Sequence, residues 1–313
     1  MQDGDEKNLM CWVVSEGMAG TENQCIAVAE ALGVAFDEIK RIALRQPWKS
    51  LSPYIGLEQV WSFSPALSAP WPDLVIAAGR KSIAASRYIK RRHPATFTVQ
   101  IQDPRVDPAQ FDLVAVPHHD PTRGKNVVVT DASPNRITAE KLAAARSEFP
   151  QFEMIKPPRV AVLIGGTSKA YRMDTDIMRG LAQALAGLDA GLMVTPSRRT
   201  GAENEGILQA ALPPDAYIWD GDGSNPYFGM LAWADTILVT ADSASMLSDA
   251  CSTGKPVYMI PLKGGHPRID KLHAHLQNLG ALRVWDGRLD AFSYAPLNDA
   301  AKVANAIRDT LEL

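Results

Sequence analysis

Small polar residues gather at the expected start of a helix in the second half of the chain. An apolar stretch at 237–240 is typical of a buried strand, and Asp242, Ser243 and Ser245 follow it. The first N–H groups of a helix carry partial positive charge and bind phosphate. Asp249, about one turn into the helix, could accept hydrogen bonds from a ribose diol. Helix capping by Asp242 or Ser243 explains the same residues, and both interpretations stay open.

A second polar loop follows an earlier apolar stretch. Residues 159–164 are predicted to form a buried parallel strand, and Gly165-Gly166-Thr167-Ser168-Lys169 comes directly after it. Paired glycines let a backbone approach a ligand closely. A Gly-Gly turn is also common in α/β proteins simply as the connection between a strand and a helix. Because ligands of open α/β sheets bind at the carboxyl ends of the strands, the two loops together favour a ligand site.

Two more segments are candidates for the same site. Arg198 and Arg199, within Ser197-Arg198-Arg199-Thr200, follow the expected strand 191–195 and suit a diphosphate; an exposed surface pair is the alternative. Asn225-Pro226-Tyr227 precedes an expected helix at 228–234. It could contact a base or a sugar, or simply cap that helix.

The first half opens with a strand pattern at 11–15 and a glycine-containing loop. Gly17 and Gly20 permit a tight turn, but the loop lacks the G-x-G-x-x-G spacing, which disfavours NAD. Thr21-x-x-Gln24 is typical of a capping box for a helix at 22–32. The other interpretation is a loop that receives an acceptor substrate.

Two further loops of the first half carry charged residues. Arg80 follows the expected strand 73–78, and Asp103 and Arg105 follow the expected strand 96–101. The two arginines could hold phosphate in a bidentate manner, and Asp103 is a candidate general base. Asp103-Pro104 is also an ordinary turn starter.

Basic and aromatic residues are interleaved between Lys40 and Trp71, and the expected helix at 81–91 adds further cations. This composition suits the interface of an anionic membrane. A solvated helix face beside a loop packed on the core is the alternative.

The bulk composition bounds the class of protein. The 313 residues suit two domains of about 150 residues, and 46% hydrophobic and 21% charged residues are ordinary for a soluble globular protein. A net charge of −3 argues against a general nucleic-acid binder. The cysteines Cys11, Cys25 and Cys251 show no metal-ligand spacing and fit a reducing cytoplasm.

The start of the chain is acidic and polar, unlike a signal peptide. No apolar run approaches the roughly 18 residues that span a bilayer. We therefore expect a cytoplasmic protein, with peripheral contact to the inner membrane as a further hypothesis.

Strand and helix patterns alternate from end to end, which predicts an α/β fold of two doubly wound Rossmann-like domains with a cleft between them. Prolines between Phe149 and Pro158 interrupt the alternation and place the domain boundary, giving domains 1–155 and 156–313. The last helix either stays in the second domain or returns to the first. The remaining expected strands are 111–116, 126–129, 216–219, 257–260 and 281–284.

Taken in order, these segments resemble the bacterial relatives of the plant "elongated mitochondria" fission protein, a family also described as glycosyltransferases. The resemblance covers nearly the whole chain and implies the two-domain glycosyltransferase B architecture. The second domain is similar to the donor domain of the enzyme that adds N-acetylglucosamine to lipid-linked peptidoglycan precursor, with Asp249 where a glutamate usually holds the ribose. The matching segments are Gly17–Gln24, Ala78-Gly79-Arg80, Asp103-Pro104-Arg105, Gly165-Gly166, Ser197-Arg198-Arg199-Thr200, Asn225-Pro226-Tyr227 and Val239–Ser243.

The resemblance implies sugar transfer from a nucleotide diphosphate donor to a cell-envelope glycolipid or saccharide, with no metal or other cofactor. The acid pair nearest to an Asp-x-Asp donor motif, Asp220-Gly221-Asp222, is predicted to be a loop. Glu22 and Asp103 are the candidate catalytic residues, and the acceptor side comprises Gly17, Gly20, Asn23, Gln24, Arg80 and Arg105. The expected donor contacts are Gly165, Gly166, Thr167, Ser168, Arg198, Arg199, Thr200, Asn225, Tyr227, Thr240, Asp242, Ser243, Ser245, Met246 and Asp249.

Two other functions stay open. A sugar-nucleotide 2-epimerase shares this architecture and would need several acids and a histidine, for which His118-His119 is the candidate. A non-catalytic membrane-associated or division-related factor would keep the fold and the basic aromatic surface.

Overall fold

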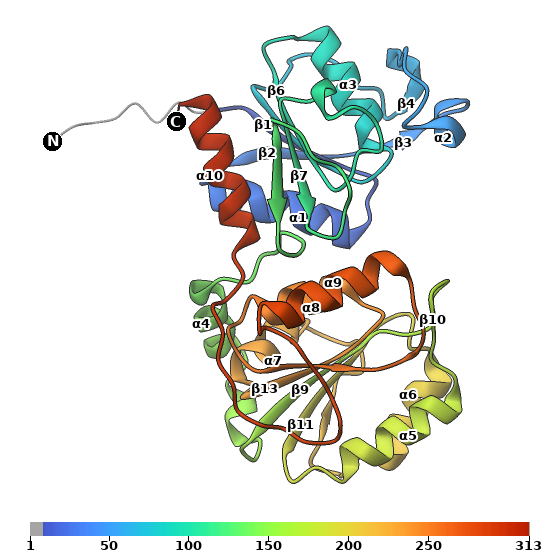
Figure 1. Ribbon diagram of the computed structural model, residues 1–313, viewed down its shortest axis with the longest axis vertical. Coiled ribbons are helices and arrows are strands. Elements are labelled where there is room, and N and C mark those ends of the chain that lie inside the picture. The colour runs from blue at the N-terminus through green and yellow to red at the C-terminus, as the bar shows by residue number, and fades with distance from the viewer. Residues whose placement is uncertain (1–8, 313) are drawn as a thin grey trace, which may run out of the picture. The chain divides into compact units, whose positions relative to one another are not determined.

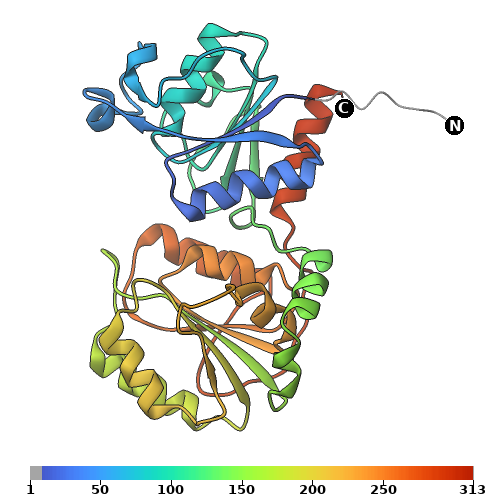
Figure 2. The same cartoon turned by 180° about the vertical axis from the view of Figure 1, so that it is seen from behind.

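The computed structural model describes residues 9–312, apart from the side chain of Asp37. The chain forms two compact units. The first comprises the chain up to Arg136 together with the segment from Asn298 on, and the second comprises Ile137–Leu297. Each unit is built on its own six-stranded sheet (Figure 1, Figure 2).

The sheet of the first unit is parallel throughout, in the order β2-β1-β5-β6-β7-β8. Its inner strands are buried at every position, as expected for a parallel sheet covered on both faces. Helices α1 and α10 pack on one face and α3 on the other. The elements are β1 (Cys11–Ser15), α1 (Ala19–Leu32), β2 (Phe36–Arg41), β3 (Ala43–Leu44), α2 (Trp48–Leu51), β4 (Phe63–Ser64), β5 (Leu74–Ala78), α3 (Ser82–Arg92), β6 (Phe97–Ile101), β7 (Leu113–Pro117), β8 (Val127–Thr130) and α10 (Asp299–Leu311).

The second unit repeats the design with a parallel sheet in the order β12-β11-β9-β13-β14-β16. Helices α5 and α6 pack on one face, and α8 and α9 lie on the other (Figure 1). The elements are α4 (Ala139–Glu148), β9 (Arg159–Ile164), β10 (Tyr171–Arg172), α5 (Thr175–Ala186), β11 (Gly191–Pro196), α6 (Ala202–Ala211), β12 (Tyr217–Ile218), α7 (Tyr227–Trp233), β13 (Thr236–Thr240), α8 (Ala244–Cys251), β14 (Val257–Ile260), β15 (Lys263–Gly264), α9 (Pro267–Asn278) and β16 (Arg283–Val284).

Every strand expected from the apolar patterns is present, with bounds that differ by a few residues. The pattern does not predict β2, because this edge strand carries four charged residues among six and its apolar signal is weak. Helix α1 begins at Ala19, before the expected start at 22. The Thr21 hydroxyl donates to the Met18 carbonyl (2.9 Å), so the capping-box interpretation of Thr21 and Gln24 is wrong.

The division between the units falls at Arg136–Ile137, whereas the proline cluster placed it at 155–156. Helix α4 belongs to the second unit because it packs on α7. The Trp233 indole donates to the Arg146 carbonyl (3.2 Å), and the Arg146 guanidinium lies over the indole ring at 3.9 Å. The proline-rich segment therefore lies inside the second unit.

The last helix, α10, belongs to the first unit. It packs on α1, and Val303, Ala304 and Ile307 are part of the core that α1 shares with the sheet. The Asp299 carboxylate accepts hydrogen bonds from the backbone N–H groups of Asp131 and Ala132, both at 2.8 Å. Within residues 9–312, no helix combines the length and apolar character needed to cross a bilayer.

Candidate functional site

A buried carboxylate, Asp242, joins the loops at the carboxyl edge of the second sheet. It accepts hydrogen bonds from the Gly166 N–H (3.0 Å) and the Thr240 hydroxyl (2.7 Å). The Arg199 guanidinium forms an ion pair with it at 2.8 Å, and the Asp242 side chain has no exposed area. These contacts hold the loops after β9, β11 and β13 together, as the parallel topology predicts.

The same contacts explain the paired glycines. A Cβ on Gly165 would lie 2.2 Å from the Asp242 carboxylate, and one on Gly166 would lie 2.0 Å from the Arg199 carbonyl oxygen. The Ser197 and Thr200 hydroxyls donate to the Gly165 carbonyl at 2.8 and 2.5 Å. The close approach that the glycines permit is therefore made to atoms of the chain itself.

Helix α8 begins beside this loop. Ser243 is its N-cap and accepts a hydrogen bond from the Met246 N–H (3.4 Å), which confirms the capping interpretation for Ser243 rather than Asp242. Ser245, in the first turn, is exposed. The first N–H groups of a helix have no partner inside the helix, so this terminus can still receive an anion.

Tyr227 and Asp249 form a hydrogen-bonded pair between α7 and α8. The Tyr227 hydroxyl donates to Asp249 Oδ2 at 2.9 Å. Burial raises the pKa of Asp249 to about 7, and the bond from Tyr227 offsets only part of that effect. Burial, with the Asp249 charge as a second cause, also raises the pKa of Tyr227 well above its usual value. Asp249 is thus a carboxyl whose charge changes near neutral pH.

Lys255 fixes the end of α7, the helix that carries Tyr227. Its Nζ donates to the carbonyls of Leu231, Ala232 and Ala234 at 2.7, 2.7 and 2.6 Å. Burial lowers the pKa of Lys255 to about 8. A cation at the C-terminus of a helix is favourable for the helix dipole, so Lys255 has a structural role here.

More cations lie at this sheet edge. Arg198 is exposed, and a short ribbon of β10 and β15 places Arg172 directly opposite Lys263. Both of these side chains are exposed, and neither forms an ion pair within residues 9–312. Like charges that face each other across two strands repel. An anion bound at this edge would relieve that repulsion.

In the first unit, Glu22 forms a three-residue network with Ser15 and Arg41. The Ser15 hydroxyl donates to Glu22 Oε2 (2.8 Å), and the Arg41 guanidinium donates to both carboxylate oxygens (3.0 and 2.7 Å). The Arg41 hydrogen bonds are the largest cause that lowers the pKa of Glu22. Glu22 is therefore held as a carboxylate of low basicity.

Two further contacts join the loops after β1, β5 and β6. The Glu16 carboxylate accepts from the Lys81 backbone N–H and pairs with Lys81 Nζ, each at 2.8 Å. The Gln102 side chain donates to buried Gln24 at 3.1 Å. The predicted meeting of these loops at one edge of the first sheet is therefore correct.

Asp103 lies at this edge and is half-buried. Its Oδ1 accepts from the Thr122 hydroxyl (2.7 Å) and from the Arg105 N–H (2.9 Å), so no cation neutralises it through these bonds. Gly20 lies in the first turn of α1, and Gly17, next to Glu16, has a φ of +79°. Asn23, Arg80 and Arg105 are exposed around the same edge.

The described residues hold no group of three or more histidine, cysteine, aspartate or glutamate side chains arranged for a metal ion. His118 and His119 follow β7, and His119 lies 3.6 Å from Asp120.

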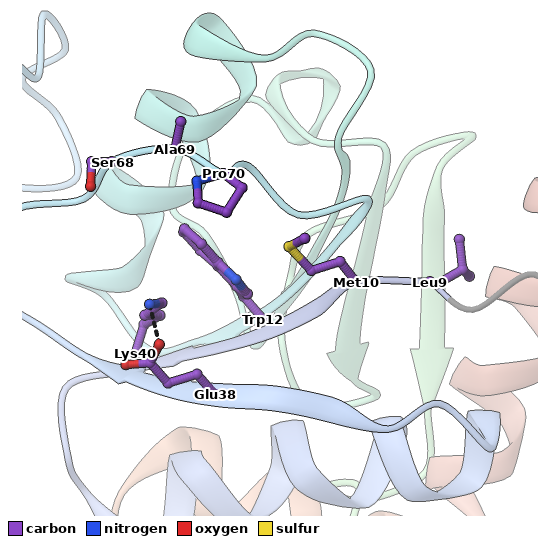
Figure 3. Close-up of a pocket in the computed structure, with 8 residues that line it drawn as sticks. All are labelled: Leu9, Met10, Trp12, Glu38, Lys40, Ser68, Ala69 and Pro70. Carbon is purple, nitrogen blue, oxygen red and sulfur yellow. Dashed lines mark hydrogen bonds and ion pairs between the residues drawn. The ribbon is translucent and has the colours of Figure 1, made fainter.

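A pocket of about 490 Å³ lies on the first unit between β1, β2 and residues 68–70 (Figure 3). Lys40 extends over the Trp12 ring at 4.5 Å and forms an ion pair with Glu38. Because Lys40 already has Trp12 and Glu38 as partners, this pocket is less suited to an anionic ligand than the carboxyl edge of the second sheet.

Sequence reasoning missed Arg41, Lys81 and the Arg172–Lys263 pair. Arg41 lies on the strand that the apolar pattern did not reveal, and Arg172 and Lys263 meet across a two-residue ribbon without its own periodicity. Glu16 offered a signal, because it follows β1 in the same way as the other site residues follow their strands.

The chain is similar to a known family and to known proteins over most of its length. The family model described as "Mitochondrial fission ELM1" matches residues 19–311. The mitochondrial fission protein ELM1 of Arabidopsis thaliana is 33% identical over 273 residues, which cover 77% of this chain and 64% of the plant protein. The uncharacterized protein RP120 of Rickettsia prowazekii (strain Madrid E) is 27% identical and covers 96% of this chain and 98% of its own length.

Two solved structures share the fold over nearly the whole chain. One is a Listeria monocytogenes protein provisionally described as a UDP-N-acetylglucosamine 2-epimerase (TM-score 0.52, 9% identity, 98% of this chain and 88% of that one). The other is Os79 Q202A from O. sativa in complex with UDP (TM-score 0.51, 11% identity, 97% and 91%). The predicted fold class, two doubly wound Rossmann-like domains of the glycosyltransferase B type, is confirmed.

Proposed function

The chain belongs to the mitochondrial fission ELM1 family, and from that premise we propose that it is a glycosyltransferase. It moves a sugar from a nucleotide diphosphate donor to a glycolipid or saccharide of the cell envelope. It works in the cytoplasm, at the inner membrane, and needs no metal or other cofactor. The observation that carries the proposal is the Asp242 cluster beside the N-terminus of α8.

The donor binds at the carboxyl edge of the second sheet. The diphosphate lies against the α8 N-terminus with Ser243 and Ser245, and the ribose hydroxyls donate to Asp249. Arg199 is already oriented by Asp242, and Arg198 is exposed beside it. When the bond from the sugar to the diphosphate breaks, negative charge grows on the departing nucleotide, and these arginines stabilise it. The remaining expected donor contacts complete the proposed donor site: Thr167, Ser168, Thr200, Asn225, Thr240 and Met246.

The acceptor binds at the carboxyl edge of the first sheet. Its hydroxyl must lose a proton as it attacks the sugar, and Asp103 is better suited than Glu22 to take that proton. Glu22 is bound to Arg41, which lowers the pKa of Glu22. Within residues 9–312, the Asp103 carboxylate instead accepts hydrogen bonds from the Thr122 hydroxyl and the Arg105 backbone N–H. Glu22 instead orients the loop that carries Gly17 and Asn23.

Titration of UDP into the protein without magnesium tests the donor site. A ligand at 100 times its Kd stabilises the folded state by about 2.7 kcal/mol, so a thermal-shift screen of nucleotide sugars reveals the preferred donor. We expect Arg198→Ala to weaken UDP binding by about tenfold. Arg179→Ala is the matched control, because within residues 9–312 that exposed arginine is bound to Asp176 and Thr175 of its own helix, α5. Equal losses in both variants would contradict the assignment.

Incubation with the preferred nucleotide sugar separates the alternatives. Epimerisation of the sugar without an acceptor would indicate the 2-epimerase, whose fold the Listeria protein shares. No nucleotide binding at all, with an intact fold by circular dichroism, would favour the non-catalytic factor that the plant relative's name suggests.

A further inference from the structure

The first unit carries a cluster of exposed apolar side chains at one side. Of the nine large apolar side chains that are exposed within residues 9–312, five lie between 51 and 61. Monomeric proteins seldom leave such a cluster without a partner. We call Leu51, Tyr54, Leu57, Val60 and Trp61 the 51–61 patch. Helix α2 and the β3–β4 ribbon, which flank it, project from the first unit in both views (Figure 1, Figure 2).

The backbone of the 51–61 patch is strained at Leu57. Leu57 is 81% exposed and has a φ of +62°, a left-handed conformation that leucine rarely adopts. Strain of this kind persists only where the surroundings enforce it, and it gathers at functional sites. A leucine that is both strained and exposed contributes little to the folded state.

The inner side of the segment is anchored by arginines of α3. Arg87 donates to the carbonyls of Pro53 (2.7 Å) and Ile55 (2.9 Å) and pairs with buried Glu58 at 2.5 Å. Arg91 pairs with the other Glu58 oxygen at 2.8 Å. The Trp48 indole donates to the Gly56 carbonyl (3.0 Å), with its ring in the core. The segment is therefore fixed with its apolar side chains facing outward.

The charges around the patch have one sign. Arg45 and Lys49 are exposed and form no ion pair within residues 9–312. Between residues 42 and 72 the only acid is Glu58, whose side chain is fully buried and paired with two arginines. The exposed charge of this segment is positive, so it complements a negatively charged surface.

We propose that the 51–61 patch docks the protein on an anionic lipid bilayer. Trp61 and Tyr54 lie at the level of the headgroups, Leu57 and Leu51 reach the acyl boundary, and Arg45 and Lys49 contact lipid phosphates. Apolar side chains with flanking cations form the two-part signal that holds a protein at such a surface. The biological purpose of docking, access to a lipid-linked acceptor, rests on the proposed function; the docking itself does not.

Vesicle flotation of the full chain tests the proposal. We expect binding at low salt to vesicles of phosphatidylcholine mixed with phosphatidylglycerol, and much weaker binding to phosphatidylcholine alone. Leu57→Ser combined with Trp61→Ser should lower the partition coefficient by roughly tenfold or more. Arg45→Gln combined with Lys49→Gln should lower it by roughly tenfold for the anionic vesicles only. Met154→Ser is the matched control, because Met154 is 88% exposed but lies in the second unit, and it should bind like the wild type.

Each variant is also titrated with UDP, so that a failure of docking is distinguished from a failure of the donor site. Unchanged thermal unfolding shows that the patch variants fold. No binding of the wild type to anionic vesicles at low salt overturns the proposal, and so does binding that the patch variants do not alter. A dimer in solution that Leu57→Ser and Trp61→Ser dissociate, without vesicle binding, would assign the patch to a second copy of the chain instead.

Discussion

The burial of Asp249 makes the proposed ribose contact sensitive to pH. Because burial raises the pKa of Asp249 to about 7, the folded protein keeps a proton that the unfolded chain has lost between about pH 4 and pH 7. Through this group, the free energy of unfolding falls as the pH rises across that window and is constant above it. A ribose that donates hydrogen bonds favours the ionised carboxylate, so ligand affinity changes in the opposite direction.

We expect Asp249→Asn to raise the free energy of unfolding at pH 8 by about 1–3 kcal/mol, since it removes a buried charge. The same variant should weaken UDP binding and remove its increase between pH 6 and pH 8. Thermal unfolding and titration calorimetry at the two pH values measure both effects. The ratio of wild-type to variant affinity cancels the titration of the UDP phosphate itself. A variant that binds UDP as tightly as the wild type would show that Asp249 does not contact the ribose.

Gly166 is a test of the loop geometry. Alanine there would place a Cβ 2.0 Å from the Arg199 carbonyl oxygen, and a backbone atom cannot swing aside as the end of a side chain can. We expect Gly166→Ala to lower the free energy of unfolding by roughly 3 kcal/mol. Gly180 lies at an exposed position of helix α5, and a Cβ there would have no neighbour within 4 Å, so Gly180→Ala should instead stabilise by about 0.5–1 kcal/mol. Chemical denaturation of both variants makes the comparison, and equal effects would contradict the clash.

The sequence allowed the residue types of the site to be predicted better than their roles. Glu22 was identified as a candidate base, but its partner Arg41 lies 19 residues away on an edge strand, and that partner decides its acidity. From the sequence alone, Asp242 and Ser243 were equally good candidates for the N-cap of α8, and only the structure shows that Ser243 is the cap. Asp242 instead binds Gly166 and Arg199, which are 76 and 43 positions away. Contacts of this kind depend on tertiary packing, which local patterns do not encode.

At the scale of elements, the β10–β15 ribbon sets two cations against each other. We expect Arg172→Gln to stabilise the ligand-free protein by about 0.2–1 kcal/mol, because it removes the repulsion from Lys263. High salt screens exposed charges, so this gain should shrink when the ionic strength is raised. Inorganic pyrophosphate should stabilise the wild type more than the variant. Arg179→Gln, which loses an ion pair with Asp176, should be neutral or destabilising in the same melts. A destabilised Arg172→Gln would show that the repulsion is not significant.

The elements themselves were largely predictable, for a physical reason. Strands of a doubly wound sheet are buried on both faces and appear as continuous apolar runs, as in Val160–Ile164 and Ile237–Thr240. The edge strand β2 and the ribbons β3–β4 and β10–β15 do not form continuous apolar runs, because part of each is exposed to solvent. The start of α1 was also misjudged, since Ala19 follows an N-cap without a capping side chain.

At the scale of the whole molecule, the chain leaves the first unit and returns to it. Phe149-Pro150 and Pro157-Pro158 mark no boundary, because the Arg159 guanidinium donates to the carbonyls of Phe152 and Glu153 and so holds that segment in the second unit. Arg308 of α10 donates to the Ala31 carbonyl of α1 (2.7 Å), a contact 277 residues apart in sequence. A proline cluster is a local signal, whereas the division into units depends on which helix completes which core.

Because each unit has its own apolar core, we expect two thermal transitions in scanning calorimetry. Ile307→Ala removes a fully buried side chain from the first core and should lower one transition by at least about 4 °C, from a loss of about 2–5 kcal/mol. Leu185→Ala, fully buried in the second core, should lower the other by a similar amount. UDP should raise only the transition that Leu185→Ala lowers, because the proposed donor site lies in the second unit. A single transition that shifts with both variants and with UDP would mean that the two cores unfold as one cooperative structure.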